Sequence, residues 1–267
     1  MSTFFRRSLL LLLLLSVAAA QALAGADDST LARIQERGQL ILGTSGNMPT
    51  MSQVDASGKL SGFDVDIARL MADVMGVKLV PKVLPFGELI PALEAGEVDV
   101  VISNMTITPQ RNLRVAFVGP YMTSGKCIVT RSEALAKAKE SPDLNTAATR
   151  IAALDGSTSE KFAKELFPQA TVVTVDDYEA AAELVKADKV TGMLTDYPIC
   201  VATLKSNPEA GFVSLFSLLT YEPIGIALPA GDAQFINWTQ NFLSRLEGTD
   251  TLKGLAKQWL GEIRAKR

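Results

Sequence analysis

Short apolar runs and amphipathic stretches follow one another along this chain. The apolar runs at 40–44 and 98–102 have the length of buried strands. Between them, Phe63, Ile67 and Met71 recur at the spacing that places side chains on one face of a helix. Strands that alternate with helices in this way favour parallel sheets with crossover helices. The pattern therefore predicts an α/β fold.

The polar stretch from Ser103 to Arg111 follows one of these strands and leads into a helix. Thr108 stands where a helix N-cap is expected, and Pro109 at the first helical residue, where its missing N–H costs no hydrogen bond. Open α/β sheets bind ligands where their strands end, and the guanidinium of Arg111 beside free N–H groups suits a small carboxylate. An ordinary loop with a surface arginine fits this stretch equally well.

The alternating pattern is interrupted twice, near 121–125 and at 221–223. Each α/β stretch has about the size of a domain, so we expect two lobes, the first built from two separate parts of the chain. The expected boundaries are 25–122 and 223–267 for the first lobe and 123–222 for the second. We interpret 119–121 as a turn that leaves the first lobe, and 131–149 as a surface helix with a connector.

The N-terminal segment has the organisation of a secretory signal peptide. Arg6 and Arg7 precede an apolar stretch at 8–20, which is followed by the small-residue cleavage site around Ala24. The apolar stretch is too short to span a membrane comfortably, and no later segment is long enough. We therefore predict that residues 1–24 are removed after Ala24 and that the mature protein resides in the periplasm.

Composition excludes several classes of function. The chain contains no histidine, which excludes histidine acid–base catalysis, serine–histidine and cysteine–histidine nucleophiles and histidine metal sites. The formal net charge of −3 argues against nucleic acid as a partner. We expect no metal and no cofactor. An oxidising compartment would permit Cys127 and Cys200 to pair, but their spacing does not establish a bridge, and we favour two buried free thiols.

Several motifs occur together in the order and spacing of a known family. They are Gly62-Phe63-Asp64-Val65-Asp66, Leu89-Ile90-Pro91-Ala92-Leu93, 105–111, 155–160 and Thr195-Asp196. With these motifs the chain resembles the extracellular solute-binding proteins of the polar amino acid ABC-transporter family, family 3. The resemblance implies a type II periplasmic-binding-protein fold. In that fold two lobes, each with a mixed, mostly parallel sheet flanked by helices, are joined by two hinge strands and close on a ligand.

The resemblance also implies how the ligand carboxylate is held. Arg111 is expected to bind the α-carboxylate, assisted by the hydroxyl group of Thr106. From the opposite lobe, Ser157 and Thr158 are expected to add a hydroxyl group and a backbone N–H. The planar fork of an arginine and the N–H groups of a helix N-terminus both suit an anion. Capping of the helix alone is the commoner role for a residue such as Ser157.

The resemblance places the α-ammonium group of the ligand on Asp196, with a backbone carbonyl near Asn104. The side-chain pocket is expected to be lined by Ser45, Met48, Met51 and Phe86. Many relatives carry an acid and two aromatic residues where this chain has the first three of these. Methionine is apolar and adaptable, so we expect an uncharged amino acid or a close analogue rather than lysine, arginine or histidine.

The implied function is that of the substrate-binding component of an ABC importer, without enzyme activity. Such a protein captures an amino acid between its lobes and delivers it to a permease in the inner membrane, and we expect it to act as a monomer. Two alternatives stay open: a dehydratase for prephenate or arogenate on the same scaffold, and a sensory protein that presents its ligand to a receptor. Catalysis would need an acid over the substrate ring, and the expected pocket offers little beyond Asp196.

Overall fold

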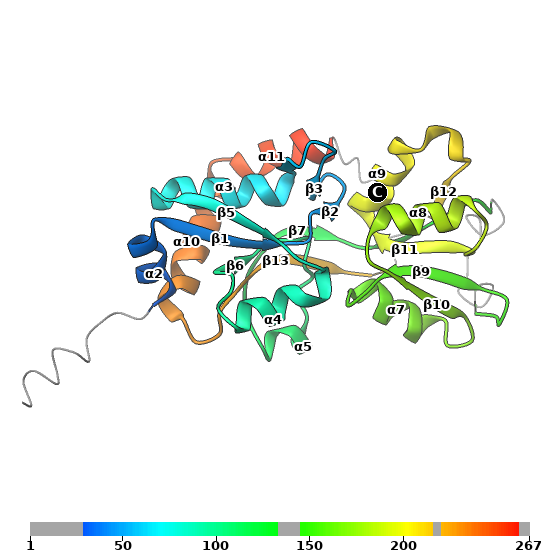
Figure 1. Ribbon diagram of the computed structural model, residues 1–267, viewed down its shortest axis with the longest axis horizontal. Helices are drawn as coiled ribbons and strands as arrows, with labels where there is room; N and C mark the ends of the chain where they lie inside the picture. The colour runs from blue at the N-terminus through cyan, green and yellow to red at the C-terminus, as the bar shows by residue number, and fades with distance from the viewer. Residues whose placement is uncertain (1–28, 133–144, 216–219, 262–267) are drawn as a thin grey trace, which may run out of the picture.

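The computed structural model describes residues 29–132, 145–215 and 220–261. The predicted signal peptide and most of the predicted surface helix at 131–149 lie outside the described residues. Two five-stranded sheets organise the described chain, each in its own α/β unit, and the two units lie side by side (Figure 1). We call the unit around the first sheet lobe 1 and the unit around the second sheet lobe 2.

The sheet of lobe 1 is mixed. Its strands are β1 (Gln39–Thr44), β5 (Lys78–Val83), β6 (Val100–Val101), β7 (Ala116–Ser124) and β13 (Glu222–Leu228). They lie in the order β5-β1-β6-β13-β7, in which β1 is parallel to β5 and β6 while β13 is antiparallel to β6 and β7. The strand predicted at 98–102 is therefore real but shorter, since only two of its residues pair as a strand.

Helices cover both faces of this sheet. They are α2 (Thr30–Arg37), α3 (Phe63–Met75), the 3-10 helix η1 (Phe86–Glu88), α4 (Leu89–Glu94), α5 (Pro109–Asn112), α10 (Ala233–Gly248) and α11 (Thr251–Leu260). Helix α3 contacts β1 from one side and α4 contacts it from the other (Figure 1). The predicted apolar face of Phe63, Ile67 and Met71 is buried. A small sheet of β2 (Asn47–Met48), β3 (Ser52–Val54) and β4 (Leu60–Ser61) joins β1 to α3.

Lobe 2 repeats this architecture. Its strands are β8 (Lys126–Thr130), β9 (Arg150–Leu154), β10 (Thr171–Val175), β11 (Gly192–Asp196) and β12 (Val213–Leu215), in the order β10-β9-β11-β8-β12. Strand β9 is parallel to β10 and β11, whereas β8 is antiparallel to its two neighbours. The helices are α7 (Thr158–Leu166), α8 (Tyr178–Lys186), α9 (Tyr197–Ser206) and the 3-10 helix η3 (Pro208–Ala210). The α/β fold class with mixed, helix-flanked sheets is confirmed.

Two paired strands, β7 and β13, pass between the lobes (Figure 1). Their register shifts between Ile224 and Ile226. The turn predicted at 119–121 is wrong, because these residues lie within β7. Val118 pairs with Ile226 and Met122 with Ile224, so Pro120 lies at the register shift, where its missing N–H removes no ladder hydrogen bond. Glu222, which lies in the second predicted interruption of the pattern, is the first residue of β13.

The two cysteines form a disulfide, which makes the expectation of free thiols wrong. Cys127 lies on β8 and Cys200 on α9, and their Cα atoms are 6.6 Å apart. Both residues are fully buried. The fold thus brings together two cysteines that are 73 positions apart in the sequence, which their spacing alone did not reveal.

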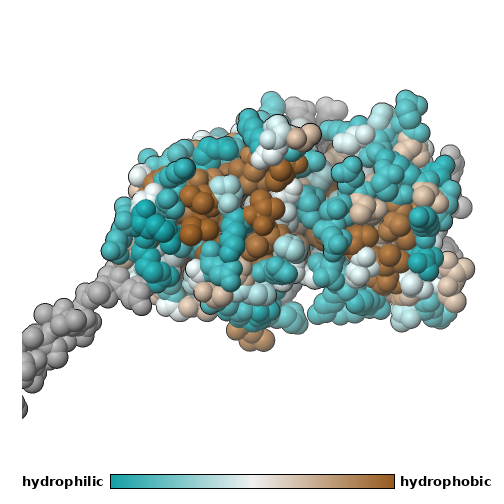
Figure 2. Space-filling view, in the orientation of Figure 1, coloured by the Kyte–Doolittle hydropathy of each residue, from teal (hydrophilic) through white to brown (hydrophobic). Residues whose placement is uncertain are grey.

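The surface is mostly polar. Figure 2 shows teal, hydrophilic residues over much of one face, with apolar patches on both lobes. Val74, Val83, Leu113 and Tyr221 are the large apolar side chains most exposed among the described residues. None of the helices within the described ranges has the length and apolar character needed to cross a membrane.

Candidate functional site

The loop from Ser103 to Arg111 begins just after β6, at the side of lobe 1 that faces lobe 2. Asp64, at the start of α3, fixes its first turn: the backbone N–H of Asn104 donates to Asp64 Oδ2 over 2.7 Å. The hydroxyl group of Tyr121 donates to Asp64 Oδ1, also over 2.7 Å. Burial raises the pKa of Asp64 to about 6, and these two hydrogen bonds only partly oppose the rise. Asp64 therefore holds the backbone of the 103–111 loop and does not pair with Arg111.

Backbone hydrogen bonds attach the same loop to the strand that joins the lobes. The N–H of Ile107 donates to the carbonyl of Pro223 over 2.7 Å, and the N–H of Gly225 donates to the carbonyl of Met105 over 3.0 Å. Thr106, which lies between Met105 and Ile107, forms an isolated antiparallel β-bridge with Ile224 on β13. Any ligand held by this loop is therefore coupled to the segment at which the lobes are connected.

Arg111 lies in the first turn of α5, as the sequence predicted. Thr108 caps that helix and accepts a hydrogen bond from the N–H of Arg111 over 3.2 Å. The guanidinium donates to the carbonyl oxygen of Thr106 over 2.9 Å and to that of Gly156 in lobe 2 over 3.2 Å. We call this region between the lobes, around Arg111, Thr158 and Asp196, the cleft. The Cζ of Arg111 lies 5.4 Å from the centre of the Phe86 ring. The side chain is thus held in place by oxygen atoms that carry no formal charge.

The electrostatics of Arg111 leave its charge available. Withdrawal from water lowers the pKa of its guanidinium to about 10, and the nearby acids Asp196 and Glu222 partly oppose this shift. The group remains a cation at neutral pH. None of the ion pairs formed among the described residues includes Arg111.

Ser157 and Thr158 lie at the N-terminus of α7 in lobe 2. The predicted capping is found, since Ser157 Oγ accepts from the N–H of Glu160 over 3.1 Å. Glu160 in turn accepts from the N–H of Gly156 over 2.9 Å. The Thr158 hydroxyl faces lobe 1 and lies 3.3 Å from the hydroxyl of Thr106. The structure thus brings Thr106 and Thr158 together, whereas the hydroxyl group of Ser157 caps α7.

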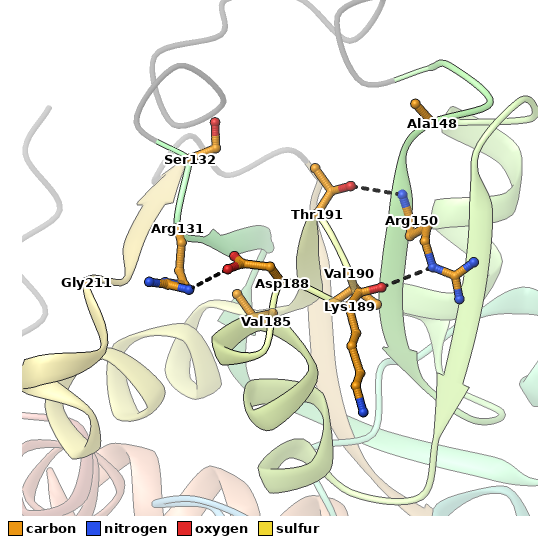
Figure 3. A pocket seen from close by; sticks show the side chains of 10 residues that line it. All are labelled: Arg131, Ser132, Ala148, Arg150, Val185, Asp188, Lys189, Val190, Thr191 and Gly211. Carbon is orange, nitrogen blue, oxygen red and sulfur yellow. Dashed lines mark hydrogen bonds and ion pairs between the residues drawn. The ribbon is translucent and has the colours of Figure 1, made fainter.

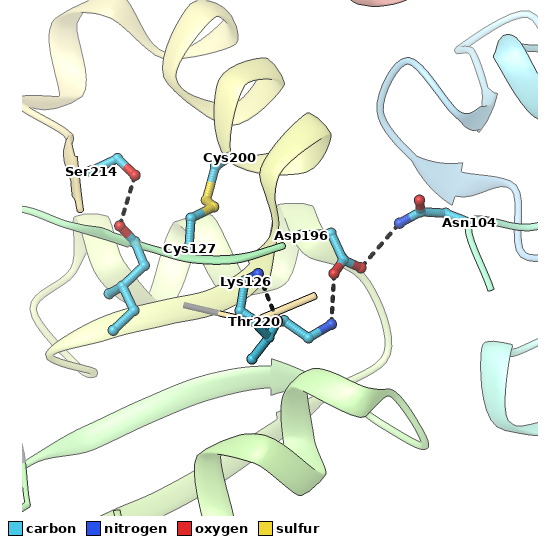
Figure 4. Close-up of a disulfide and its surroundings, with 8 residues drawn as sticks. Asn104, Lys126, Cys127, Asp196, Cys200, Ser214 and Thr220 are labelled. Carbon is cyan, nitrogen blue, oxygen red and sulfur yellow. Dashed lines mark hydrogen bonds and ion pairs between the residues drawn. A yellow bond between two sulfur atoms is a disulfide. The ribbon is translucent and has the colours of Figure 1, made fainter. Parts of the chain in front are cut away.

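Asp196 and Asn104 also meet across the cleft. Asp196 ends β11 and is 5% exposed. Its Oδ2 accepts from Nδ2 of Asn104 over 3.1 Å (Figure 4). Asn104 adopts a left-handed backbone conformation (φ 46°), which asparagine tolerates better than most residues. The side-chain oxygen of Asn104 is buried and makes no hydrogen bond to any described residue.

Lys126 is a site residue that the sequence did not reveal. It begins β8, is completely buried, and places its Nζ 2.6 Å from Asp196 Oδ1 (Figure 4). The same ammonium donates to Thr158 Oγ1 over 2.7 Å and lies 3.6 Å from Glu222 Oε2. The available signal was a lysine directly before the apolar run 127–129. A charged residue there needs a buried partner.

Three of the four residues of the expected side-chain pocket, Met48, Met51 and Phe86, belong to one cluster of buried apolar side chains. Met48 and Met51 are buried in the hydrophobic core of lobe 1, at 1% and 0% exposure. Ser45 is also buried, and its N–H donates to Ser103 Oγ over 3.0 Å. Phe86 is the member that contacts Arg111. Within the described ranges, no group of three or more acids or cysteines could hold a metal ion.

The two lobes touch at several further points. Nδ2 of Asn47 donates to the carbonyl of Asp176 over 2.7 Å. At Gly156, whose φ is +69°, a Cβ atom would lie only 2.9 Å from the Cα of Gly87 in lobe 1. The lobes are therefore in direct contact at both of these points. A separate depression of about 660 Å³ lies at the far end of lobe 2, lined by polar residues such as Arg131 and Asp188 (Figure 3).

Comparison with known sequences agrees with this architecture. The chain is 26% identical over 223 residues to the ABC transporter arginine-binding protein 1 of Escherichia coli, covering 81% of this chain and 88% of that protein. It is 30% identical over 205 residues to the glutamine-binding protein of Geobacillus stearothermophilus, covering 75% of this chain and 76% of that protein.

Solved structures are similar over most of the chain. An ancestral amino acid-binding protein described as a precursor of cyclohexadienyl dehydratase is 35% identical, with a TM-score of 0.81 and coverage of 87% of this chain and 99% of that one. A binding component of an ABC transporter from Wolinella succinogenes, complexed with lysine, is 34% identical with a TM-score of 0.81, and covers 86% of this chain and 98% of that one. The model of one family matches residues 40–262. The chain therefore belongs to the bacterial extracellular solute-binding proteins, family 3.

Proposed function

We propose that this chain is the substrate-binding component of an ABC importer and captures an amino acid, or a close analogue, by its carboxylate group. Relatives of this kind are named for arginine and glutamine, and one similar structure contains lysine. The observation that carries the proposal is Arg111. Its guanidinium lies between the lobes and belongs to no ion pair of the described residues, so a ligand carboxylate can use its planar fork.

The mechanism is capture by closure. The ligand binds to the 103–111 loop of lobe 1, and lobe 2 closes over it by movement at β7 and β13, near the proposed boundaries 122/123 and 222/223. The closed form then delivers the ligand to a permease in the inner membrane. We propose that the protein acts as a monomer in the periplasm after cleavage behind Ala24.

The ligand side chain is proposed to be uncharged. Phe86 offers an apolar ring beside Arg111. Many relatives carry an acid at the position of Ser45, which here is hydrogen-bonded to Ser103. We also propose that the protein does not convert its ligand chemically. Both cleft acids, Asp196 and Glu222, face Lys126, which leaves neither as a free acid above a bound ring. Purified protein should accordingly leave prephenate and arogenate unchanged.

The test is a calorimetric screen of wild type against amino acids and their carboxylate analogues. At least one is expected to bind, and Arg111→Ala is expected to weaken that binding by about a hundredfold or more, since it removes a charge-assisted bidentate contact. Arg114→Ala is the matched control, because Arg114 is exposed and pairs with Glu94 away from the cleft. Equal loss in both variants, or no ligand at all in the screen, would contradict the proposal.

A further inference from the structure

Lys126 places an ammonium group of the protein where the family resemblance places that of the ligand. Its Nζ lies 2.6 Å from Asp196 and 2.7 Å from Thr158, the residues expected to hold a ligand from lobe 2. The side chain is completely buried, as is its immediate surrounding of strand β8. This lysine is therefore a built-in part of the cleft and not a surface residue that happens to reach it.

The acids of the cleft already have donors for all of their oxygen atoms. Asp196 Oδ1 accepts from Lys126, and Oδ2 accepts from Asn104. Glu222 Oε1 accepts from the hydroxyl of Thr220 over 2.8 Å, and Oε2 accepts from that of Thr158 over 3.3 Å. A ligand ammonium would have to share these oxygen atoms with Lys126, and the two positive charges would repel each other across one carboxylate.

The groups left for a ligand are of a different kind. Arg111 offers a cation without an acidic partner among the described residues. Asn104 donates from its Nδ2 to Asp196, and the other atom of the same amide, the side-chain oxygen, is buried and accepts no hydrogen bond from a described residue. One acceptor suits a hydroxyl group, which donates one hydrogen bond. It does not suit an ammonium group, which brings three N–H donors and a charge.

We infer that Lys126 determines ligand specificity by occupying the ammonium subsite from within the protein, so that the ligand is a small carboxylate without an α-ammonium group. A 2-hydroxy acid fits best, with its carboxylate on Arg111 and its hydroxyl donating to Asn104. This inference rests on the proposed function, because it takes carboxylate capture by Arg111 as given. It narrows the ligand to the analogues and excludes the α-amino acids themselves.

The first test uses the wild-type protein and matched ligand pairs that differ only at the α-substituent. L-phenylalanine is compared with L-phenyllactate, L-leucine with its 2-hydroxy analogue, and any amino acid that binds in the calorimetric screen with its own 2-hydroxy counterpart. The hydroxy acid is expected to bind at least about tenfold more tightly than its partner in the pair that binds best. An amino acid that binds as tightly as its hydroxy counterpart, or more tightly, overturns the inference.

The second test removes the positive charge of Lys126. Lys126→Met keeps the length of the side chain and removes its charge, which leaves Asp196 without a cation. The preference is expected to move by at least about tenfold toward the amino acid of each pair. Lys161→Met is the control, because Lys161 is an exposed residue of the same lobe, and it should leave the preference unchanged. An unchanged preference in a folded Lys126→Met protein also overturns the inference.

The outcomes separate this inference from the proposal beneath it. Binding of amino acids in preference to hydroxy acids, with loss in Arg111→Ala, leaves the importer function intact and removes the role of Lys126. Absence of binding for every carboxylate contradicts the proposed function itself, and the inference falls with it. If Lys126→Met does not fold, as judged by circular dichroism, the preference of the wild-type protein alone decides.

Discussion

The cleft contains two buried or partly buried cations, Arg111 and Lys126, whose partners differ in charge. Arg111 of lobe 1 is held by two carbonyl oxygen atoms, and no acid of the described chain pairs with it. Lys126 of lobe 2 is completely buried and pairs with Asp196, with Glu222 close by. A cation held by uncharged oxygens keeps its attraction for an anion, whereas a cation neutralised by acids has become part of the protein interior.

This difference separates binding from stability. Removal of one partner of a buried ion pair leaves an uncompensated charge in a medium that solvates it poorly, which costs several kcal/mol. Removal of a cation that has only carbonyl partners leaves oxygen atoms that water can reach when the lobes part. We therefore expect substitutions on the Lys126 side to affect folding and those at Arg111 to affect ligand binding.

The largest effect is expected for Asp196→Ala. This change leaves Lys126 buried without its nearest acid and should lower the free energy of unfolding by about 3–5 kcal/mol. Urea denaturation of the ligand-free protein measures it. Glu165→Ala, at an exposed residue of the same lobe, is the control and should change the unfolding free energy by less than about 0.5 kcal/mol. Similar small losses in both would show that the buried pair is not structural.

The disulfide is expected to have the next largest effect. Cys127 follows Lys126 on β8, and Cys200 lies in the helix that follows Asp196, so the bond fixes the two segments that carry the pair. The double variant Cys127→Ala/Cys200→Ala should lose about 2–4 kcal/mol of unfolding free energy, because the bond closes a long loop in the unfolded chain. Reduction of the wild-type protein should lower its melting temperature in the same way, and reduction of the double variant should change nothing. A wild type that melts identically with and without reductant would argue against the bond.

A smaller effect, with a definite pH dependence, is expected at Asp64 in lobe 1. Because its folded-state pKa of about 6 lies above the ordinary value of 3.8, the folded protein keeps a proton that the unfolded chain releases in this window. This contribution to stability is present at low pH and is lost as the pH rises through about 6. Relative to Asp64→Asn, wild type should gain about 2 kcal/mol of unfolding free energy between about pH 6.5 and about pH 4. A difference that stays constant over this range would contradict the assignment.

The smallest effect on folding is expected for Arg111→Ala. Its loss should change the unfolding free energy of the ligand-free protein by no more than about 0.5 kcal/mol, because no charged partner is left unpaired. The same variant should lose the stabilisation that a ligand gives to wild type, which is about 2.7 kcal/mol at a hundred times the dissociation constant. Thermal melts with and without ligand compare the two quantities. A large loss without ligand would make Arg111 a structural residue like Lys126.

The elements of the fold were largely predictable because their signals are local. Gly38 and Gly76 end α2 and α3 in left-handed conformations, and Thr108 and Ser157 cap the helices that follow them. The course of β7 through Gly119 and Pro120 was not predictable, because the two residues are ordinary turn formers. Their place in a strand depends on the register shift between β7 and β13, which leaves both residues without a partner in the ladder.

The site was predictable only in part, and for a related reason. The motif around Arg111 is recognisable in the sequence because a cap residue, a proline and an arginine follow one another. Asp196 is recognisable because it stands at the end of a predicted strand. Lys126 has no such marker, because what makes it a site residue is its meeting with Asp196 and Glu222, 70 and 96 positions further along the chain. The disulfide escaped prediction in the same way. Partners that are brought together only by the fold leave no local pattern.

The contact between Gly87 and Gly156 has a practical consequence. A side chain at position 156 would collide with lobe 1, but one at position 87 meets its neighbours at 3.7 Å or more. Since the chain's two cysteines are bonded to each other, Gly87→Cys would supply a single reactive thiol at the lip of the cleft. A fluorescent dye attached there would lie against lobe 2 in the closed form and in water once the lobes separate. Position 87 is thus the natural attachment point for converting this protein into an optical sensor of its ligand.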